Sequence, residues 1–313
     1  MKRILITGGA GFIGSHVADA CVAGGNEVMV IDDLSSGKKE QVPAEARFVL
    51  CDVASDTAAE AVRTFRPEIL IHHAAQINVR ASVADPQFDA QVNILGSIRL
   101  LESARRNGVR KFIFASSGGA GYGEQERFPA DESHPVRPVS PYGAAKMSVE
   151  LYLNYYRAQY GLDYTALRYS NVYGPRQDPH GEAGVVAIFA ERLLKGQTAV
   201  VNGDGEQTRD FVYVGDVVRA NLDALSRGDG LSVNIGTGVE TSVNTVFRIL
   251  RDLAGSRQEE IHGPAMPGEQ RRSCLENRMA SYELGWYPET SLEEGLARTL
   301  EFFRRKIINA GKW

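Results

Sequence analysis

Short apolar runs alternate with amphipathic segments over the first 170 residues of the chain. The runs are rich in Ile, Val and Leu and predict strands at Arg3–Thr7, Glu27–Asp32, Arg47–Cys51, Ile69–His72, Lys111–Ser116 and Tyr164–Arg168. Helices are predicted between them at Phe12–Ala23, Asp56–Phe65, Asp85–Arg106 and Tyr142–Tyr160. Continuous apolar strands alternating with helices are typical of a parallel sheet covered on both faces. We therefore expect an α/β fold built on a Rossmann-type, doubly wound parallel sheet.

The regular alternation ends at about residue 170, where loops rich in glycine and proline take over. Loops carried by a rigid sheet are where substrate contacts usually lie, so we predict a smaller C-terminal α/β substrate domain. Residues 208–236 resume the helix and strand pattern and are expected to return to the sheet. The first domain then comprises residues 1–170 plus about 208–236, and the second comprises about 171–207 plus 237–313.

Composition narrows the classes of function. With 313 residues, 43% of them hydrophobic, the chain can bury a core large enough for two domains. The net charge of −4, with acidic and basic residues interspersed, argues against nucleic acid or a membrane surface as the main partner. The three cysteines match neither a disulfide framework nor a metal site, so we expect no metal and a reducing, cytoplasmic location. We find no apolar run long enough to span a bilayer and no signal-peptide pattern.

A glycine-rich segment, Thr7–Gly14, follows the first predicted strand and opens the first predicted helix. Its glycines allow a tight turn and let backbone N–H groups approach a pyrophosphate at the helix N-terminus. Asp32 ends the second strand, in the place where a carboxylate accepts hydrogen bonds from an adenosine ribose. Such a carboxylate would repel a 2′-phosphate, which favours NAD over NADP, although Lys38 and Lys39 are near enough to reach a phosphate. The alternative for Asp32 is an ordinary loop carboxylate.

Tyr142 and Lys146 form the most informative pair of residues. They are four apart on a predicted helix, so their side chains share one face and the ammonium can approach the phenol. A tyrosine ionises near pH ~10, but a fixed cation beside it favours the phenolate. Lowering its pKa by about three units needs roughly 4 kcal/mol, which Lys146 and a positively charged cofactor ring together could supply. Taken alone, the pair is also compatible with an ordinary amphipathic helix.

Motifs along essentially the whole chain resemble the extended short-chain dehydrogenase/reductase family, and within it the UDP-glucose 4-epimerase-like enzymes. The motifs are Thr7–Gly14, Asp32–Gly37, His73–Gln76, Asn93, Ser116–Gly123, Tyr142–Lys146, Arg168–Arg176, Gln207–Phe211 and Asn234–Gly238. The resemblance implies NAD-dependent 4-epimerisation of a UDP-hexose, either UDP-glucose/UDP-galactose or also UDP-GlcNAc/UDP-GalNAc. Hydride transfer from sugar C4 would give a 4-keto intermediate, which takes the hydride back on its other face.

The resemblance also implies roles for individual residues. Tyr142 would be the base for the sugar 4-hydroxyl, and Lys146 would lower its pKa and bind the nicotinamide ribose. Ser117 would position the 4-hydroxyl, with Ser116 as the fallback. The residues implied for NAD are Gly8, Gly11, Phe12, Ile13, Gly14, Asp32, Asp33, Asp52, Val53, Ala74, Ala75, Gln76, Asn93, Tyr142, Lys146 and Tyr169. The residues implied for the substrate are Ser117, Asn171, Val186, Arg209, Glu269 and Ser273.

Some of these residues have simpler alternatives. Local capping or turn bonding is an alternative for Asn93 and Asn171. Arg209 resembles the arginine that contacts the nucleotide diphosphate, and its planar fork suits that group, but a surface ion pair with Asp204 or Asp210 is an alternative. The neighbouring histidines 72 and 73 lack partners in a metal pattern, so we interpret them as filler at the sheet edge.

Two positions depart from the family pattern. Two glycines follow Ser117 where the related 4,6-dehydratases need Asp-Glu, which counts against dehydration. Met266 stands where a second phosphate-binding arginine is usual, so either Arg271 or Arg272 compensates or diphosphate affinity is reduced. Ser273 lies at the family's gate beside the sugar's C2 substituent, and a small residue there leaves room for an N-acetyl group.

The predicted helix at Tyr142–Tyr160 is apolar all round, whereas one face suffices to cover the sheet. We therefore expect a homodimer through helices 85–106 and 141–160, as in the family. The alternative is burial under C-terminal loops.

Three functions compete for this sequence. The first is the 4-epimerisation described above. The second is epimerisation of a UDP-hexuronic acid or another nucleotide-sugar oxidoreduction on the same site. Net reduction predicts exchange with free NAD(P)H, whereas epimerisation predicts a tightly retained cofactor. The third is a non-catalytic nucleotide-binding protein, which the presence of Tyr142, Lys146 and the serine hydroxyls disfavours.

Overall fold

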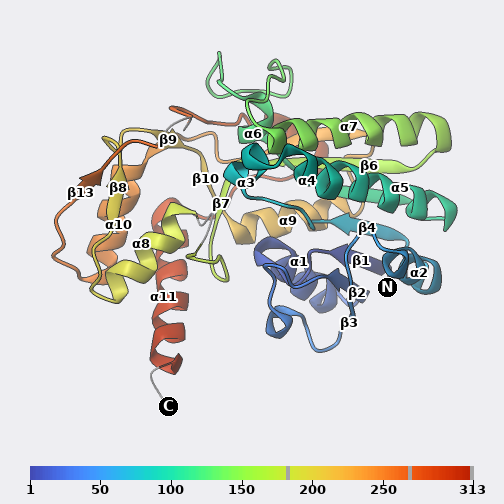
Figure 1. The fold of residues 1–313 in the computed structure, drawn as a ribbon, viewed down its shortest axis with the longest axis horizontal. Coiled ribbons are helices and arrows are strands. Elements are labelled where there is room, and N and C mark those ends of the chain that lie inside the picture. The colour runs from blue at the N-terminus through green and yellow to red at the C-terminus, as the bar shows by residue number, and fades with distance from the viewer. Residues whose placement is uncertain (181–183, 267–269, 311–313) are drawn as a thin grey trace.

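The centre of the molecule is a seven-stranded sheet whose paired strands all run parallel (Figure 1). The computed structural model describes residues 1–180, 184–266 and 270–310. In spatial order the strands are β11 (Leu231–Ile235), β6 (Asp163–Tyr169), β5 (Lys111–Ser117), β4 (Ile69–His72), β1 (Arg3–Thr7), β2 (Glu27–Asp32) and β3 (Arg47–Leu50). The six strands expected in the first 170 residues are confirmed, with ends that differ by no more than one residue.

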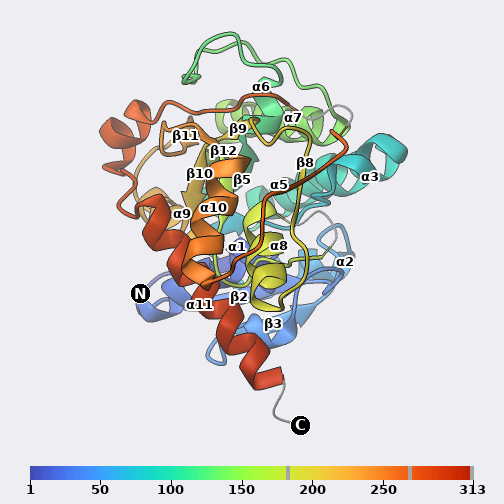
Figure 2. The ribbon, with the colours of Figure 1, turned by 90° about the vertical axis from the view of Figure 1, so that its left-hand side faces the viewer.

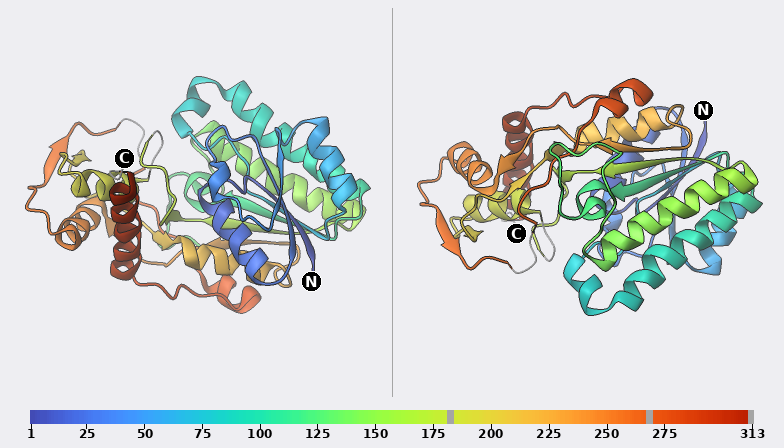
Figure 3. Two further views of the ribbon diagram at one scale, coloured as in Figure 1. Left: turned by 90° about the horizontal axis from the view of Figure 1, so that it is seen from below. Right: turned by 90° about the horizontal axis from the view of Figure 1, so that it is seen from above.

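Helices cover both faces of this sheet, as the continuous apolar strands require (Figure 3). Ile4 and Ile6 of β1 pack into one core and Leu5 into the other, because successive side chains of a strand point to opposite faces. The helices on the first face are α1 (Phe12–Ala23) and α9 (Val214–Ala224), and those on the second are α2 (Asp56–Phe65), α5 (Gly96–Arg106) and α7 (Pro141–Tyr160). The expected doubly wound architecture is confirmed.

The helix expected at residues 85–106 consists of three successive parts. They are α4 (Pro86–Ala90), the π-helical segment η2 (Gln91–Leu95) and α5, preceded by α3 (Val79–Ala84). A π-helical turn inside an α-helix often marks a functional site. Asn93, one of the residues implied for NAD, lies in this turn.

A second unit lies beside the carboxyl ends of the strands, on the left of Figure 1 and facing the viewer in Figure 2. Its apolar core includes Phe189, Phe247 and Phe303. Its helices are α8 (Val185–Leu194), α10 (Val243–Ala254) and α11 (Leu292–Ala310). Among its described residues, three two-stranded pairs complete it: β7 (Asn171–Tyr173) with β10 (Phe211–Tyr213), β9 (Thr208–Arg209) with β12 (Thr241–Ser242), and β8 (Val200–Asn202) with β13 (Ile261–Gly263).

The chain returns to the first unit after entering the second. The helix α9 packs on the seven-stranded sheet, and β11 is an edge strand of that sheet, paired with β6. Ala280, Leu284 and Trp286 also pack into the core on that side, within and just after the short helix η3 (Ala280–Leu284). The predicted residue boundaries of the two domains stay a prediction. Within the described ranges, we find no helix that is both long and apolar enough to cross a membrane.

The strand order places a switch point between β1 and β4. From β1 the chain continues to β2 and β3 on one side, and β4 then starts the other half of the sheet. In open α/β sheets, ligands bind outside the carboxyl ends of the strands at such a point. These two strands end at Thr7 and His72.

Candidate active site

The turn from β1 into α1 is packed too tightly for side chains at two of its glycines. Gly8 has a φ of 69°, and a Cβ on it would lie 2.5 Å from the nitrogen of Ala74. A Cβ on Gly14 would lie 2.2 Å from the carbonyl oxygen of Gly8. The helix begins at Phe12, and its N-cap residue, Gly11, has no side chain to occupy the N–H groups of the first turn. This geometry fits a dinucleotide pyrophosphate bound at the N-terminus of α1.

Asp32 ends β2 beside this turn and is 6% exposed. Its carboxylate accepts hydrogen bonds from the N–H groups of Ala10 and Leu34, both at 2.9 Å. Burial raises the pKa of Asp32, and these two bonds oppose the rise. Asp33 accepts bonds from the N–H and the hydroxyl of Ser35 and so closes its own turn. The ribose contacts implied for both carboxylates stay predictions.

The residues after β3 continue the same edge of the sheet. Asp52 accepts a hydrogen bond of 2.6 Å from the N–H of Ala54, and Val53 is buried. The ammonium of Lys39 lies 3.6 Å from the centre of the Phe48 ring, which gives this lysine a cation–π contact. The NAD contacts implied for Asp52 and Val53 stay predictions.

The loop after β4 is held by the π-helical segment. Oδ1 of Asn93 accepts a hydrogen bond from the N–H of Gln76, and Nδ2 of Asn93 donates to the carbonyl of Gln76, both at 2.9 Å. The N–H of Ala74 donates to Oγ1 of Thr7 over 3.3 Å. The amide of Asn93 is therefore a long-range clamp and not a local cap. Ala75 lies between the two fixed points of the loop.

Two histidines fill the end of the central strand. His72 Nδ1 lies 2.6 Å from Oγ1 of Thr7, and its Nε2 lies 2.9 Å from Oγ of Ser97. Nε2 of His73 lies 3.4 Å from the hydroxyl of Tyr169, and burial lowers the pKa of His73 to about 3. Both rings are therefore neutral parts of the packing, since burial also lowers the pKa of His72. We find no cluster of three or more His, Cys, Asp or Glu suited to a metal ion in the described part of the chain.

Tyr142 and Lys146 share one face of α7, as predicted. Nζ of Lys146 lies 5.6 Å from the centre of the Tyr142 ring and donates a 2.9 Å hydrogen bond to the carbonyl of Ala115. The N–H of Tyr142 donates to Oγ of Ser82 over 3.3 Å. Burial, and then the charge of Asp89, raises the pKa of Tyr142, while burial lowers the pKa of Lys146 to about 8. Among the protein's own groups, desolvation therefore disfavours the phenolate, and the lowering of the tyrosine pKa expected from Lys146 together with a positively charged cofactor ring stays a prediction.

The two serines at the end of β5 have different surroundings. Oγ of Ser116 donates a 2.5 Å hydrogen bond to the buried carboxylate of Glu150. Oγ of Ser117 accepts a 3.3 Å bond from the N–H of Ala120 and caps the short helix α6 (Gly118–Tyr122). Neighbouring side chains on a strand point to opposite faces, so only one of the two can face a ligand above the sheet. The geometry favours Ser117 for the substrate hydroxyl.

A buried ion pair lies behind this strand end, and sequence reasoning missed it. Arg168 of β6 donates to Glu150 through Nε at 3.0 and 3.1 Å and through Nη2 at 2.7 Å. Its Nη1 donates to the hydroxyl of Tyr122 over 2.9 Å. The spacing of residues in the sequence could have pointed to Glu150, because it lies one helical turn after Lys146 on the same face of α7. This pair fixes α7 against the sheet beside the serines.

The residues implied for the sugar are brought together only in part. Ser273 is 1% exposed, and its Oγ lies 3.4 Å from where a Cβ on Gly119 would be, next to the serine loop. Asn171 is exposed at the start of β7, whereas Val186 is buried in the core of the second unit. Glu269 lies outside the described residues. The substrate contacts implied for these residues stay predictions.

Tyr169, implied for NAD, is 6% exposed at the end of β6. Its hydroxyl accepts a 2.9 Å hydrogen bond from Nδ2 of Asn221 in α9. The hydroxyl is therefore fixed by the packing of the first unit.

The carboxylates considered as partners of Arg209 are bound by other groups. Asp204 pairs with Arg271 at 2.8 and 2.9 Å. Asp210 is buried, and Thr237 donates two hydrogen bonds to its carboxylate. Arg209 itself lies in β9 and donates from Nη1 to the carbonyl of Thr208 over 2.8 Å. The diphosphate contact implied for Arg209 stays a prediction.

The arginines considered as substitutes for the family arginine at position 266 also have partners. Arg271 has the ion pair with Asp204. Arg272 pairs with Glu240 at 2.5 Å, and its guanidinium lies 3.8 Å from the centre of the Phe128 ring. Both would have to leave carboxylates to reach a phosphate.

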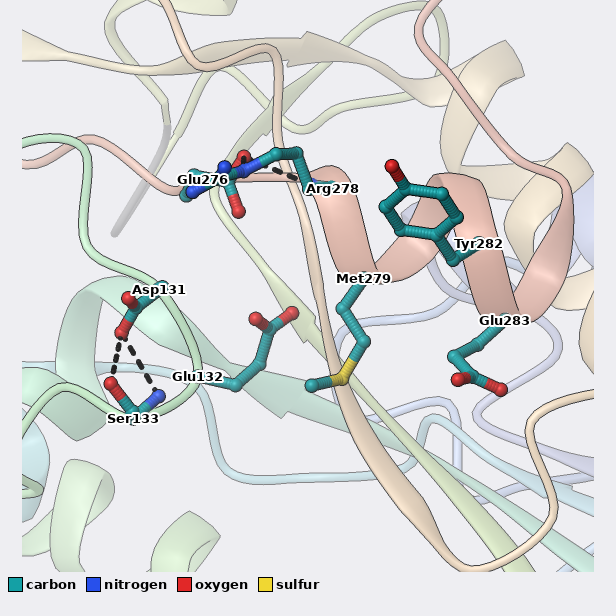
Figure 4. Close-up of a pocket in the computed structure, with 8 residues that line it drawn as sticks. All are labelled: Asp131, Glu132, Ser133, Glu276, Arg278, Met279, Tyr282 and Glu283. Atoms are coloured by element: carbon teal, nitrogen blue, oxygen red, sulfur yellow. Dashed lines mark hydrogen bonds and ion pairs between the residues drawn. The ribbon is translucent and has the colours of Figure 1, made fainter.

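A separate hollow of about 450 Å³ lies away from these groups (Figure 4). It is lined on one side by Glu132 and on the other by Met279 and Tyr282, with Arg278 donating to Glu276 at its edge. The described residues that line it include no predicted catalytic or cofactor-binding residue. We therefore place the site at the carboxyl ends of the strands and not in this hollow.

Comparison with known proteins agrees with this placement. The model of the NAD dependent epimerase/dehydratase family matches residues 4–236. The UDP-glucose 4-epimerase of Mycolicibacterium smegmatis is 48% identical over 311 residues, which cover 97% of this chain and 99% of that protein.

Two solved structures are similar over nearly the whole chain. The UDP-glucose 4-epimerase of Thermotoga maritima, solved with UDP-glucose, has a TM-score of 0.96 at 50% identity and covers 97% of this chain and 99% of its own. The UDP-glucose 4-epimerase of Thermus thermophilus, in complex with NAD, has a TM-score of 0.91 at 45% identity, with coverages of 96% and 99%. The glycine turn, the central switch point and these matches lead to one conclusion: this chain is a member of the NAD dependent epimerase/dehydratase family.

Proposed function

We propose that this enzyme interconverts the C4 epimers of a UDP-hexose, with UDP-glucose and UDP-galactose as its main substrates and NAD as its cofactor. The observation that carries the proposal is the position of Tyr142 and Lys146 on one face of α7, with the carbonyl of Ala115 holding the ammonium next to the serine at the end of β5. The relatives named UDP-glucose 4-epimerase support the same reaction.

Each catalytic side chain has a distinct task. Tyr142 accepts the proton of the sugar 4-hydroxyl, and Ser117 hydrogen-bonds that hydroxyl and guides the proton. Lys146 holds a positive charge beside the phenol and hydrogen-bonds the nicotinamide ribose. Burial raises the pKa of Tyr142, and a cation beside a phenol favours the phenolate. The chemistry supplied by bound NAD is reversible hydride acceptance at sugar C4, together with a positive ring charge that favours the phenolate.

The second unit is proposed to hold the UDP group and to admit the sugar. Arg209 contacts the diphosphate with its planar guanidinium, and Met266 contributes no charge there. Ser273 is small enough to leave space for a C2 N-acetyl group, so UDP-N-acetylhexosamines are proposed as further substrates. Gly118 and Gly119 carry no acid or base, which argues against dehydration at this site.

We also propose a homodimer through residues 85–106 and 141–160. The face of α7 turned away from the sheet exposes 74% of Leu151, 40% of Tyr152 and 47% of Tyr155. Phe88 and Leu95, on the neighbouring segment, are about half exposed. The alternative of burial beneath C-terminal loops is wrong for these side chains, and a second copy of the same face would cover them.

The test is to offer the purified protein UDP-glucose and UDP-N-acetylglucosamine separately, without added NAD, and to follow the 4-epimers by NMR. We expect conversion of UDP-glucose by cofactor retained through purification. Tyr142→Phe, which keeps the ring and removes the hydroxyl, is the matched control and should be inactive. Absence of both epimers would reject the proposal and bring forward uronic acid epimerisation or net sugar reduction.

The gate is tested with Ser273→Tyr. We expect this variant to lose conversion of UDP-N-acetylglucosamine while keeping conversion of UDP-glucose, because only the N-acetyl group needs the space. Ser273→Ala, which keeps the space, is the control. Equal exclusion of the N-acetylated sugar by wild type and Ser273→Tyr would contradict this assignment.

A further inference from the structure

Asp89 is a buried carboxylate that the reaction described above does not use. It lies in α4 and is 1% exposed. Its Oδ1 accepts hydrogen bonds from Nε2 of Gln76 at 2.8 Å and from Nδ2 of Asn93 at 3.0 Å. Its Oδ2 is buried and has no hydrogen-bond partner among the described residues. Burying a carboxylate that has an oxygen without a hydrogen-bond partner costs free energy. We therefore expect Asp89 to have a function at the neighbouring active site.

One effect of Asp89 is to tie α4 to the loop after β4. The Gln76 side chain that it holds also bonds both the N–H and the carbonyl of Asn78, the N-cap of α3. Asn93 holds the backbone of Gln76 from the other side. The loop lies against Gly8, where a Cβ would touch the backbone of Ala74. Asp89 is therefore the common acceptor in the network that fixes this loop over the dinucleotide turn.

A second effect is electrostatic. Both α3 and α4 pack on α7, which carries Tyr142 and Lys146. The charge of Asp89 adds to burial in raising the pKa of Tyr142, and it opposes the lowering of the Lys146 pKa by burial. The other charged or titratable groups around this end of α7, among the described residues, are the exposed Arg80 and Asp85, the neutral His72 and His73, and the Glu150–Arg168 ion pair.

We propose that Asp89 is a positioning residue that sets the working pH of the Tyr142–Lys146 pair and holds the Gln76 loop against bound NAD. This inference rests on the proposed function for the identity of the catalytic pair. Asp89 acts through its charge on the pair and through its hydrogen bonds on the loop.

The charge is tested with Asp89→Asn, which keeps an acceptor at Oδ1 and removes the negative charge. Without that charge both Tyr142 and Lys146 lose their protons more easily. On the acid limb of the kcat/KM profile Tyr142 must become ionised, and on the basic limb Lys146 loses its positive charge. Both limbs should therefore move to lower pH. We expect shifts of roughly one pH unit, the order of magnitude for the loss of one nearby buried charge.

Asp85→Asn is the matched control, because it removes an exposed charge from the start of the same helix and keeps a good N-cap. The acid and basic limbs of its kcat/KM profile should lie at the same pH as in the wild type. Asp89→Ser is a second neutral variant in case Asp89→Asn does not fold, and the same shift is expected. Limbs that do not move in a folded neutral variant would overturn the proposal.

The tether is tested with Gln76→Met, which removes both bonds from Nε2 and leaves Asp89 charged. We expect unchanged pH limbs and a several-fold loss of NAD during gel filtration, measured by extracting the cofactor from the protein peak. Gln87→Met, at an exposed position of α4, is the control and should retain NAD. Equal NAD retention in the two variants would overturn the tether.

A readout without turnover separates this inference from the proposed function. Tyrosinate absorbance of the NAD-loaded protein is titrated against its Tyr142→Phe counterpart, with and without Asp89→Asn. The Tyr142 step should move to lower pH in the Asp89 variant even if no UDP-sugar tested is converted. A Tyr142 step at the same pH in both backgrounds would refute the role of Asp89, whatever the substrate.

Discussion

Glu150→Gln should destabilise the protein strongly although it keeps the size of the side chain. The change leaves the guanidinium of Arg168 without its carboxylate at a site where the arginine is 8% exposed. Removing one partner of a buried ion pair costs about 3–5 kcal/mol, because the remaining charge stays desolvated. The glutamine can still accept one bond from Arg168 or from Ser116, so the low end of this range is expected for Gln and the high end for Ala.

The size of the effect can be stated as a melting temperature. The entropy of unfolding is about 2.1 cal/mol/K per residue, so for 313 residues a loss of about 3–5 kcal/mol lowers Tm by about 5–8 °C. Scanning calorimetry on the NAD-loaded protein measures this shift. Glu294→Gln, in the exposed pair with Arg298, is the control and should cost less than about 1 kcal/mol.

The double variant Glu150→Gln/Arg168→Met gives the decisive comparison. It removes both charges, so it should be more stable than the sum of the two single changes predicts, by about 2 kcal/mol or more. Strict additivity would show that the two groups do not depend on each other. A Glu150→Gln shift no larger than that of Glu294→Gln would refute the reasoning from burial.

The remaining predictions concern catalysis, assembly and affinity. Ser117→Ala should lower kcat by about 10²-fold or more in the epimerase assay, whereas Ser116→Ala should mainly lower Tm; equal losses of kcat would contradict the choice of serine. Leu151→Glu should yield monomers by sedimentation velocity, because it places a charge on the proposed dimer face, and Leu253→Glu on α10 should not; an unchanged dimer would exclude that face. Met266→Arg should tighten UDP binding in calorimetry relative to Met266→Leu, and an unchanged Kd would reject a phosphate contact there.

The elements of the first unit were predictable because their signals are local. Apart from the exposed Arg3 at the start of β1, every residue of β1 and β4 is buried, which is the pattern of strands buried on both faces. The glycine turn before α1 and the spacing of Tyr142 and Lys146 are equally local. Residues 12–23 and 56–65 form helices with the predicted ends.

The parts that could not be predicted depend on groups far apart in the chain. The π-helical turn that aims Asn93 at Gln76 interrupts an otherwise ordinary helical pattern. The sequence shows the lysine near Tyr142, but it does not show the burial of the phenol or the approach of Asp89, both of which raise the pKa of Tyr142. The resemblance implies that Val186 contacts the substrate, and the structure places it in a core whose partners come from α10 and α11. Burial and summed charge are properties of the folded chain.

The pairing of β11 with β6 restricts how homologous enzymes of this kind can be recombined. A chimera joined at one point near residue 170 would take β6 from one parent and β11 from the other, so the register from Thr165–Leu231 to Tyr169–Ile235 would join strands that never evolved together. Grafting a new sugar preference onto this scaffold therefore calls for two exchanged segments, one on either side of α9 and β11. The second must also leave in place the stretch around Trp286, which belongs to the recipient's core.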